Sequence, residues 1–306
     1  MKTSINKLIK AGLAGMLILG QTSIESCKTP EKAYQAAPIT LEQTVSKEET
    51  AMQKEPIKHG IWETLDQGLQ LTTITPDKKS QYGDSKITVL KIDPKEYSFK
   101  LMSASEYGME RTAKDWAEKY GLLATINAGM FEEDLSNVGF MQNYKHLNNP
   151  NFKKGYNSIL AFNPKTKDVP QMQIIDTGCQ SFDQLKKKYN SLSQSLRMIS
   201  CTQKNRWTQQ PRMWSTAAIG TDKKGNALFI HSRSPYTVHD FIDALLESQL
   251  DIYNAMYLEG GPEASLYINL PNRKESHIGS YETSFNENDN NHEFWLLPNI
   301  IGIQKK

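Results

Sequence analysis

The stretch TVHDFIDALLESQLDIYNAMYLEGGP, residues 237–262, contains the clearest secondary-structure signals of the chain. Apolar residues recur in its first half with the three- and four-residue spacing of one buried helical face. Thr237 is suited to cap this helix, and Asp240 stands where a capping box places an acid. The apolar run at 255–258 then predicts a buried strand, which Glu259 and two glycines follow. The stretch therefore predicts a helix, a strand and a tight turn in succession.

Outside this stretch, strand patterns outnumber helical ones. Alternating or short apolar runs predict strands that include residues 68–75, 86–92, 122–127 and 158–162. The other helical patterns cover residues 111–120 and 182–190. The order is not a clean alternation of strand and helix. We therefore expect an α+β fold, a single domain with a mixed, twisted β-sheet and packed helices.

Composition and charge exclude several classes of protein. The 306 residues carry 36 Lys and Arg against 34 Asp and Glu. This near-balance lacks the excess of positive charge on which phosphate-backbone binding depends, so no nucleic-acid partner is expected. Hydrophobic residues form 38% of the chain, which argues against an acidic disordered protein. Three cysteines are too few for a disulfide-built scaffold, and their odd number leaves one over.

The N-terminus has the pattern of an export signal. Three lysines precede an uncharged run at 11–20, which is shorter than the roughly 20 apolar residues of a membrane-spanning helix. Ser26 and Cys27 follow, and they resemble a bacterial lipoprotein cleavage site at which the cysteine becomes the lipidated first residue. Ordinary signal cleavage nearby is the alternative.

The chain is therefore expected to have three parts. Residues 1–27 form a signal peptide with a candidate lipoprotein cysteine, 28–57 a flexible linker, and 58–306 the folded domain. The expected location is outside the cytoplasm, as a periplasmic or outer-surface lipoprotein of a bacterium. The membrane is contacted only through a lipid on Cys27.

Three segments contain residues suited to chemistry. In the first, a predicted strand ends at Asn127, whose amide can face a cleft or, alternatively, only bond turn backbone. In the second, Arg197 and Arg206 lie near two tryptophans and offer planar forks for phosphate or carboxylate, with a solvated basic face as the alternative. In the third, Arg233 and Ser234 lead into the clear helix, whose N-terminus suits an anion.

Taken together and in order, these segments resemble the phosphodiester glycosidase domain family over roughly residues 85–303. Asn127-Ala-Gly-Met-Phe131 is similar to the family's Asn-Gly-Gly-Phe-Phe, and Gln194-Ser195 with Met198 is similar to its Gln-Ser-Gly-Pro-Met. Leu258-Glu-Gly-Gly-Pro262 with Ser265 is similar to its Leu-Asp-Gly-Gly-Gly-Ser. This sequence departs from the family where Glu259 replaces the Asp and Thr216 replaces an Arg.

The resemblance implies hydrolysis of a sugar-1-phosphodiester to a free sugar and a phosphomonoester, with a glycan or sugar-phosphate as substrate. Glu259 would be the general base, Glu263 the second acid, and Asn127 would bind sugar hydroxyls or phosphate. The expected substrate-binding residues are Arg197, Arg206, Arg233, Ser234, His239, Gly260 and Gly261. No cofactor is expected, and no His or Cys spacing indicates a metal site.

Two other functions stay open. The departures from the family pattern allow a non-catalytic, surface-anchored glycan-binding lipoprotein on the same scaffold. An ordinary glycoside hydrolase that uses Glu259 and Glu263 is the other alternative.

A lipid on one cysteine would account for the odd cysteine count. If Cys27 takes a lipid, Cys179 and Cys201 remain in an exported domain, on either side of the predicted basic helix. We expect them to form a disulfide. Two plain buried thiols are the alternative.

Overall fold

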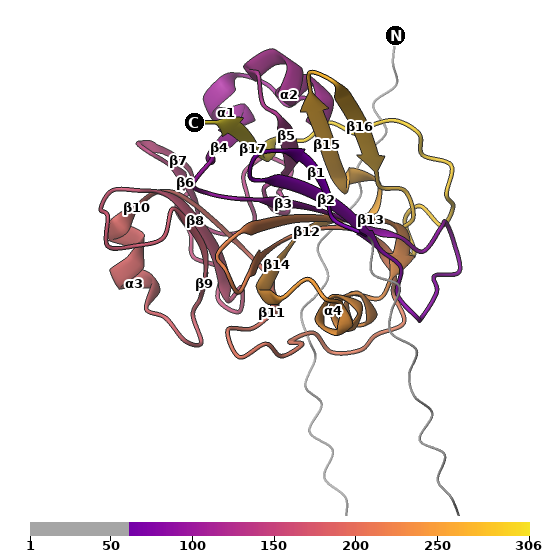
Figure 1. Cartoon of the computed structure of the whole chain (residues 1–306). Helices are drawn as coiled ribbons and strands as arrows, with labels where there is room; N and C mark the ends of the chain where they lie inside the picture. The colour runs from indigo at the N-terminus through magenta and orange to yellow at the C-terminus, as the bar shows by residue number, and fades with distance from the viewer. Residues whose placement is uncertain (1–60) are drawn as a thin grey trace, which may run out of the picture. The chain divides into compact units, whose positions relative to one another are not determined.

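The computed structural model describes residues 61–306, in which strands far outnumber helices (Figure 1). Strands account for 45% of the structure and helices for 13%, so the expected α+β class is wrong and the fold is mainly β. The predicted signal peptide, the linker and Cys27 lie outside the described residues. No helix within 61–306 is long and apolar enough to cross a membrane.

The strands form three sheets, and all their neighbours pair antiparallel. The seven-stranded sheet has the order β1 (Glu63–Asp66), β2 (Leu69–Ile74), β3 (Ile87–Ile92), β13 (Ala227–Tyr236), β12 (Trp214–Asp222), β14 (Ile252–Gly260) and β11 (Arg197–Ile199). The second sheet has the order β7 (His146–Asn149), β6 (Met141–Asn143), β10 (Tyr189–Ser195), β8 (Ser158–Pro164) and β9 (Met172–Asp176). The third has the order β16 (Arg273–Ile278), β15 (Ser265–Leu270), β5 (Ala124–Asn127), β17 (Asn299–Lys305) and β4 (Tyr97–Ser103). The expected single mixed sheet is therefore also wrong.

The three sheets share one hydrophobic core. Phe99 of the third sheet lies with its ring centroid 5.9 Å from that of Phe162 in the second and 6.4 Å from that of Phe229 in the first. Tilted and edge-on rings at these separations are a favourable aromatic arrangement. The centre of the domain is thus the meeting point of strands that lie far apart in the chain.

Each sheet also carries one short helix. α4 (Val238–Glu247) packs on the seven-stranded sheet, α3 (Phe182–Leu185) on the second, and α2 (Ala113–Tyr120) on the third. The remaining helical turns are α1 (Ala104–Tyr107), η1 (Lys186–Lys188) and η2 (Gly261–Glu263). Thr237 caps α4 by accepting a hydrogen bond from the backbone N–H of Asp240, as predicted. The predicted helix at 182–190 is much shorter, because β10 begins at Tyr189 and pairs with β6 and β8.

The disulfide between Cys179 and Cys201 is present, with the two Cα atoms 6.6 Å apart. Its partners are 22 residues apart in sequence. We expect the double variant C179S/C201S to lose about 3 kcal/mol of unfolding free energy, because the open chain gains the loop entropy that the bridge removes. Denaturant unfolding of the oxidised protein and the variant measures this loss. A difference below about 1 kcal/mol would contradict the expectation.

Candidate active site

Glu259 lies at the end of β14, where the strand departs from regular pairing with β12. Ala218 pairs with Tyr257 and Ala217 with Glu259, so Leu258 is an extra residue in a β-bulge. Bulges re-aim side chains and are common beside active sites. Here the bulge lies directly before Glu259, and the turn of Gly260 and Gly261 follows directly after it.

Three buried carboxyl groups lie within electrostatic reach of Tyr257. Glu259, Glu263 and Glu282 expose only 3%, 4% and 8% of their surface. Burial raises the pKa of Tyr257 well above its usual value of 10, and the charges of Glu259, Glu282 and Glu263 raise it further. The tyrosine therefore stays a neutral hydroxyl that can donate a hydrogen bond next to a set of acids.

The two glycines of the turn are required by what packs on them. A Cβ atom on Gly260 would overlap the Tyr257 hydroxyl and the indole of Trp214. Gly261 has a φ of +66°, a backbone conformation that residues with a side chain rarely adopt. A Cβ atom added at this position would overlap the Glu282 carboxylate. The backbone thus comes into close contact with the aromatic and acidic side chains of the site.

Asn127 fixes the position of Glu263 rather than facing open space. Its Nδ2 donates to the carbonyl of Glu263 at 2.9 Å, and its Oδ1 accepts from the N–H of Ser265 at 2.8 Å. These bonds match the alternative in which the amide bonds turn backbone. They fix the backbone of Glu263 but do not use its side chain. The Oε2 atom of Glu263 is buried and has no hydrogen-bond partner among residues 61–306. That oxygen is a candidate ligand-binding atom.

Gln194 anchors the loop that carries Tyr156. Its Oε1 accepts from the N–H groups of Phe140 and Lys153, and its Nε2 donates to the carbonyls of Lys153 and Tyr156. Burial, followed by the charges of Glu132 and Glu259, raises the pKa of Tyr156. Tyr156 therefore lies within electrostatic reach of Glu259, on a loop that Gln194 anchors.

The arginines that the sequence predicted as substrate-binding residues differ in their contacts. Arg197 donates from Nη1 to Asp176 Oδ1 at 2.5 Å, and Arg233 donates to the carbonyls of Ile278 and Asp289. Arg206 is exposed. A fourth arginine, Arg212, lies with its guanidinium carbon 5.9 Å from the ring centroid of Trp214, the residue that packs on Gly260. Arg212 thus places positive charge beside the tryptophan that packs on the turn of Gly260 and Gly261.

Ser234 and His239 have partners of their own near the start of α4. Ser234 Oγ accepts from the N–H of Ser85 at 2.8 Å. His239 Nδ1 lies 3.1 Å from Asp243 Oδ2. Among residues 61–306, neither side chain forms a hydrogen bond or ion pair with Glu259, Glu263 or Glu282, and their substrate-binding role stays a prediction.

The sequence analysis did not single out Tyr257, Trp214 or Glu282 as site residues. Tyr257 had no usable signal, because the bulge at Leu258 sets Tyr257 and Glu259 opposite neighbouring residues of β12 and so breaks the alternation of a regular strand. Glu282 had none, because it reaches the site from a loop after β16 through a bridge to Trp214. The described residues contain one cluster with metal-site spacing, Asp176 with Cys179 and Cys201, but its cysteines form the disulfide.

His231 lies buried against Ala264, the residue that follows η2, and makes stability depend on pH. Its Nε2 is 3.2 Å from the carbonyl oxygen of Ala264, and burial followed by the charge of His277 lowers its pKa from 6.5 to about 3. The unfolded chain therefore binds a proton below pH 6.5 that the folded protein does not, so stability falls as pH falls from 6.5 toward 3.

We expect the unfolding free energy to fall between pH 6.5 and pH 5 by up to about 1.4 kcal/mol per pH unit because of His231. His231→Gln retains a donor for Ala264 but removes the titration, so this slope should shrink. Denaturant unfolding at several pH values measures it. His292→Gln, at an exposed position, is the control and should keep the native slope. Equal slopes in the native protein and H231Q would overturn this assignment.

Comparison with known proteins identifies a family that this chain resembles. The family described as Phosphodiester glycosidase matches residues 120–304. A hypothetical protein from Synechocystis matches in structure with a TM-score of 0.55 at 13% identity, over 81% of this chain and 64% of that one. The chain therefore spans less than two thirds of that protein's length.

A second structure with the same fold is the zebrafish N-acetylglucosamine-1-phosphodiester alpha-N-acetylglucosaminidase catalytic domain, auto-inhibited by its pro-peptide. Its TM-score is 0.53 at 13% identity, over 81% of this chain and 87% of that one. At this identity the two structures establish the fold alone. No curated protein matches the sequence.

Proposed function

The chain belongs to the phosphodiester glycosidase family, and we propose on that premise that it is an exported hydrolase of a sugar-1-phosphodiester or a related cell-envelope glycan linkage. The family is one of glycosidase-type hydrolases. The products would be a free sugar and a phosphomonoester. The zebrafish enzyme's name specifies an N-acetylglucosamine-1-phosphodiester, which supports testing that sugar first.

The observation that carries the proposal is the set of three buried carboxyl groups whose charges act on Tyr257. Glu259 acts as the general base that takes a proton from the water attacking the anomeric carbon. Glu263 Oε2, which lacks a hydrogen-bond partner in the described part of the chain, binds a sugar hydroxyl or supplies a proton. Asn127 positions Glu263 through the backbone bonds described above.

The phosphate requires positive charge on the leaving-group side. Arg212, beside Trp214, and the exposed Arg206 are the arginines we assign to it, because a guanidinium binds phosphate oxygens with two parallel bonds. Arg197 and Arg233 already donate to Asp176 and to backbone carbonyls. Trp214 and Tyr156 offer flat faces on which a sugar ring can pack.

The location outside the cytoplasm is supported by the N-terminal pattern of lysines, apolar run and Ser26-Cys27. Labelling of growing cells with a radioactive fatty acid tests this part. The native protein is expected to be labelled and Cys27→Ser is not. Label on both proteins, or on neither, would contradict a lipid on Cys27.

Sugar release by the purified protein tests the activity. An N-acetylglucosamine-1-phosphodiester is compared with an aryl N-acetylglucosaminide that lacks phosphate. We expect release from the phosphodiester and little from the aryl glycoside. Equal release from both would favour an ordinary glycoside hydrolase. Binding without release would favour a glycan-binding protein.

A further inference from the structure

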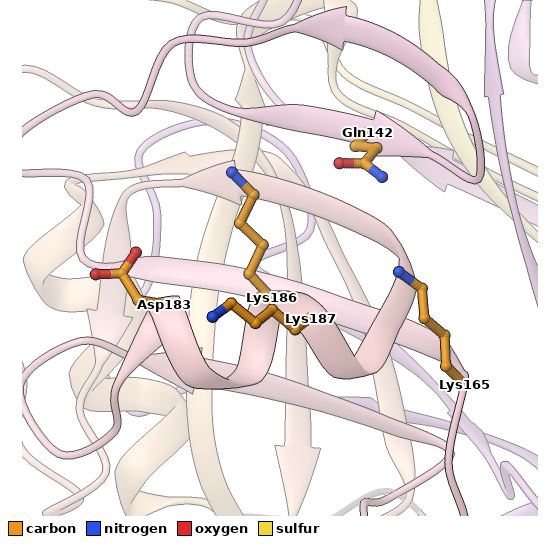
Figure 2. Close-up of a pocket in the computed structure, with 5 residues that line it drawn as sticks. All are labelled: Gln142, Lys165, Asp183, Lys186 and Lys187. Carbon is orange, nitrogen blue, oxygen red and sulfur yellow. The ribbon is translucent and has the colours of Figure 1, made fainter.

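A hollow lies on the five-stranded sheet of β7, β6, β10, β8 and β9, whereas Glu259 belongs to the seven-stranded sheet. Its volume is about 460 Å³. It is lined by Gln142, Lys165, Asp183, Lys186 and Lys187 (Figure 2), which we call the lysine pocket. None of these residues belongs to the candidate active site described above.

The backbone fixes the lysines of this pocket relative to one another. The N–H of Lys165, just after β8, donates to the carbonyl of Lys188 at 2.8 Å, which ties that strand end to η1. The ammonium of Lys186 lies 4.3 Å from the ring centroid of Phe140, a cation–π contact that orients it. Figure 2 shows Lys186 and Lys165 extending toward the strand that carries Gln142, while Lys187 lies along the helix.

The lysine pocket carries uncompensated positive charge. The neighbouring Lys188 pairs with Asp168 at 2.5 Å. Within residues 61–306, by contrast, Lys165, Lys186 and Lys187 form no salt bridge. Asp183 is the one acid of the lining, so three ammonium groups face one carboxylate.

We propose that the lysine pocket binds a phosphate group of an anionic glycan, separately from the hydrolytic site. Lysine ammonium groups bind phosphate as point charges, and the amide of Gln142 adds a polar group that can donate to an oxygen. Because the lysines line a hollow beside a hairpin strand, an inserted phosphate meets several of them, whereas a flat membrane surface does not. A glycan with several phosphates would gain affinity from repeated engagement.

The test uses the full chain and inorganic tripolyphosphate as probe, measured by titration calorimetry at low ionic strength. We expect K186Q/K187Q to weaken binding about tenfold or more, and added salt to weaken it further. K223Q/K224Q is the matched control, since it removes the same charge from an exposed turn of the seven-stranded sheet. It should bind within about twofold of the native protein.

Equal weakening by both double variants would overturn the proposal, because it would indicate non-specific attraction. Failure of the native protein to bind tripolyphosphate would also overturn it. Sedimentation with phosphatidylglycerol vesicles separates the two sources of phosphate: vesicle binding that needs Lys186 and Lys187, without tripolyphosphate binding, would favour a membrane. Hydrolysis of a small sugar-1-phosphodiester should be the same in K186Q/K187Q as in the native protein. If the native protein did not hydrolyse that substrate, the proposed function would fail, but the phosphate-binding proposal would not.

Discussion

Glu259→Gln is expected to reduce release of sugar from a glycosyl phosphodiester by about 10²- to 10⁴-fold, the usual contribution of a positioned general base. The amide is nearly isosteric and keeps an oxygen that can accept from the N–H of Gly260, the bond that Glu259 Oε1 makes at 3.0 Å. It cannot take a proton from water. The rate is measured as initial sugar release, with the fold checked by the denaturant midpoint.

The matched control for this variant is Glu293→Gln, which changes the same charge at an exposed position. It should keep the native rate. If E259Q were within about threefold of the native rate while folded, Glu259 would not be the base. Tight ligand binding by E259Q would show that the loss concerns chemistry rather than recognition.

Arg197→Met is expected to cost about 3–5 kcal/mol of unfolding free energy, because it leaves a buried charge without its partner. The Asp176 side chain is only 1% exposed and that of Arg197 14%. Asp176 also accepts from the N–H groups of Gly178 and Cys201, so it joins two loops beside the disulfide. Denaturant unfolding measures the loss.

The double variant D176N/R197M separates the ion pair from the packing of the two side chains. Neutralising Asp176 as well should recover part of the stability that R197M loses, because the effects of substitutions at two interacting residues on the unfolding free energy do not add. A loss below about 1 kcal/mol in R197M would contradict a structural ion pair. Arg197 would then be available for phosphate, as the sequence first indicated.

The sequence predicted those helices and strands that are specified by residues close together in the chain. The N-cap and apolar spacing of α4, the helical pattern of α2 and the strand before Glu259 were confirmed, as was the disulfide. The arrangement of strands into three antiparallel sheets was not predictable, because alternation fixes which face is buried but not which strand lies alongside. At Tyr189, pairing with β6 and β8 overrides the helical tendency of the lysine-rich run before it.

The candidate site shows the same division. Glu259, Gly260 and Gly261 were predicted from consecutive residues. The partner of Asn127 lies 136 residues away at Glu263, and that of Arg197 lies 21 residues away at Asp176. Such contacts depend on the packing of distant segments, so the sequence could propose these side chains for the site but not say what they bind.

The most direct test of the central claim is the fate of the oxygen atom when the protein cleaves a sugar-1-phosphodiester in ¹⁸O-labelled water. Attack on the anomeric carbon breaks the bond between C1 and the bridging oxygen, which leaves with the phosphate. The account therefore predicts ¹⁸O on C1 of the released sugar and none in the phosphomonoester. Label in the phosphate would mean attack at phosphorus and would contradict a glycosidase site at Glu259.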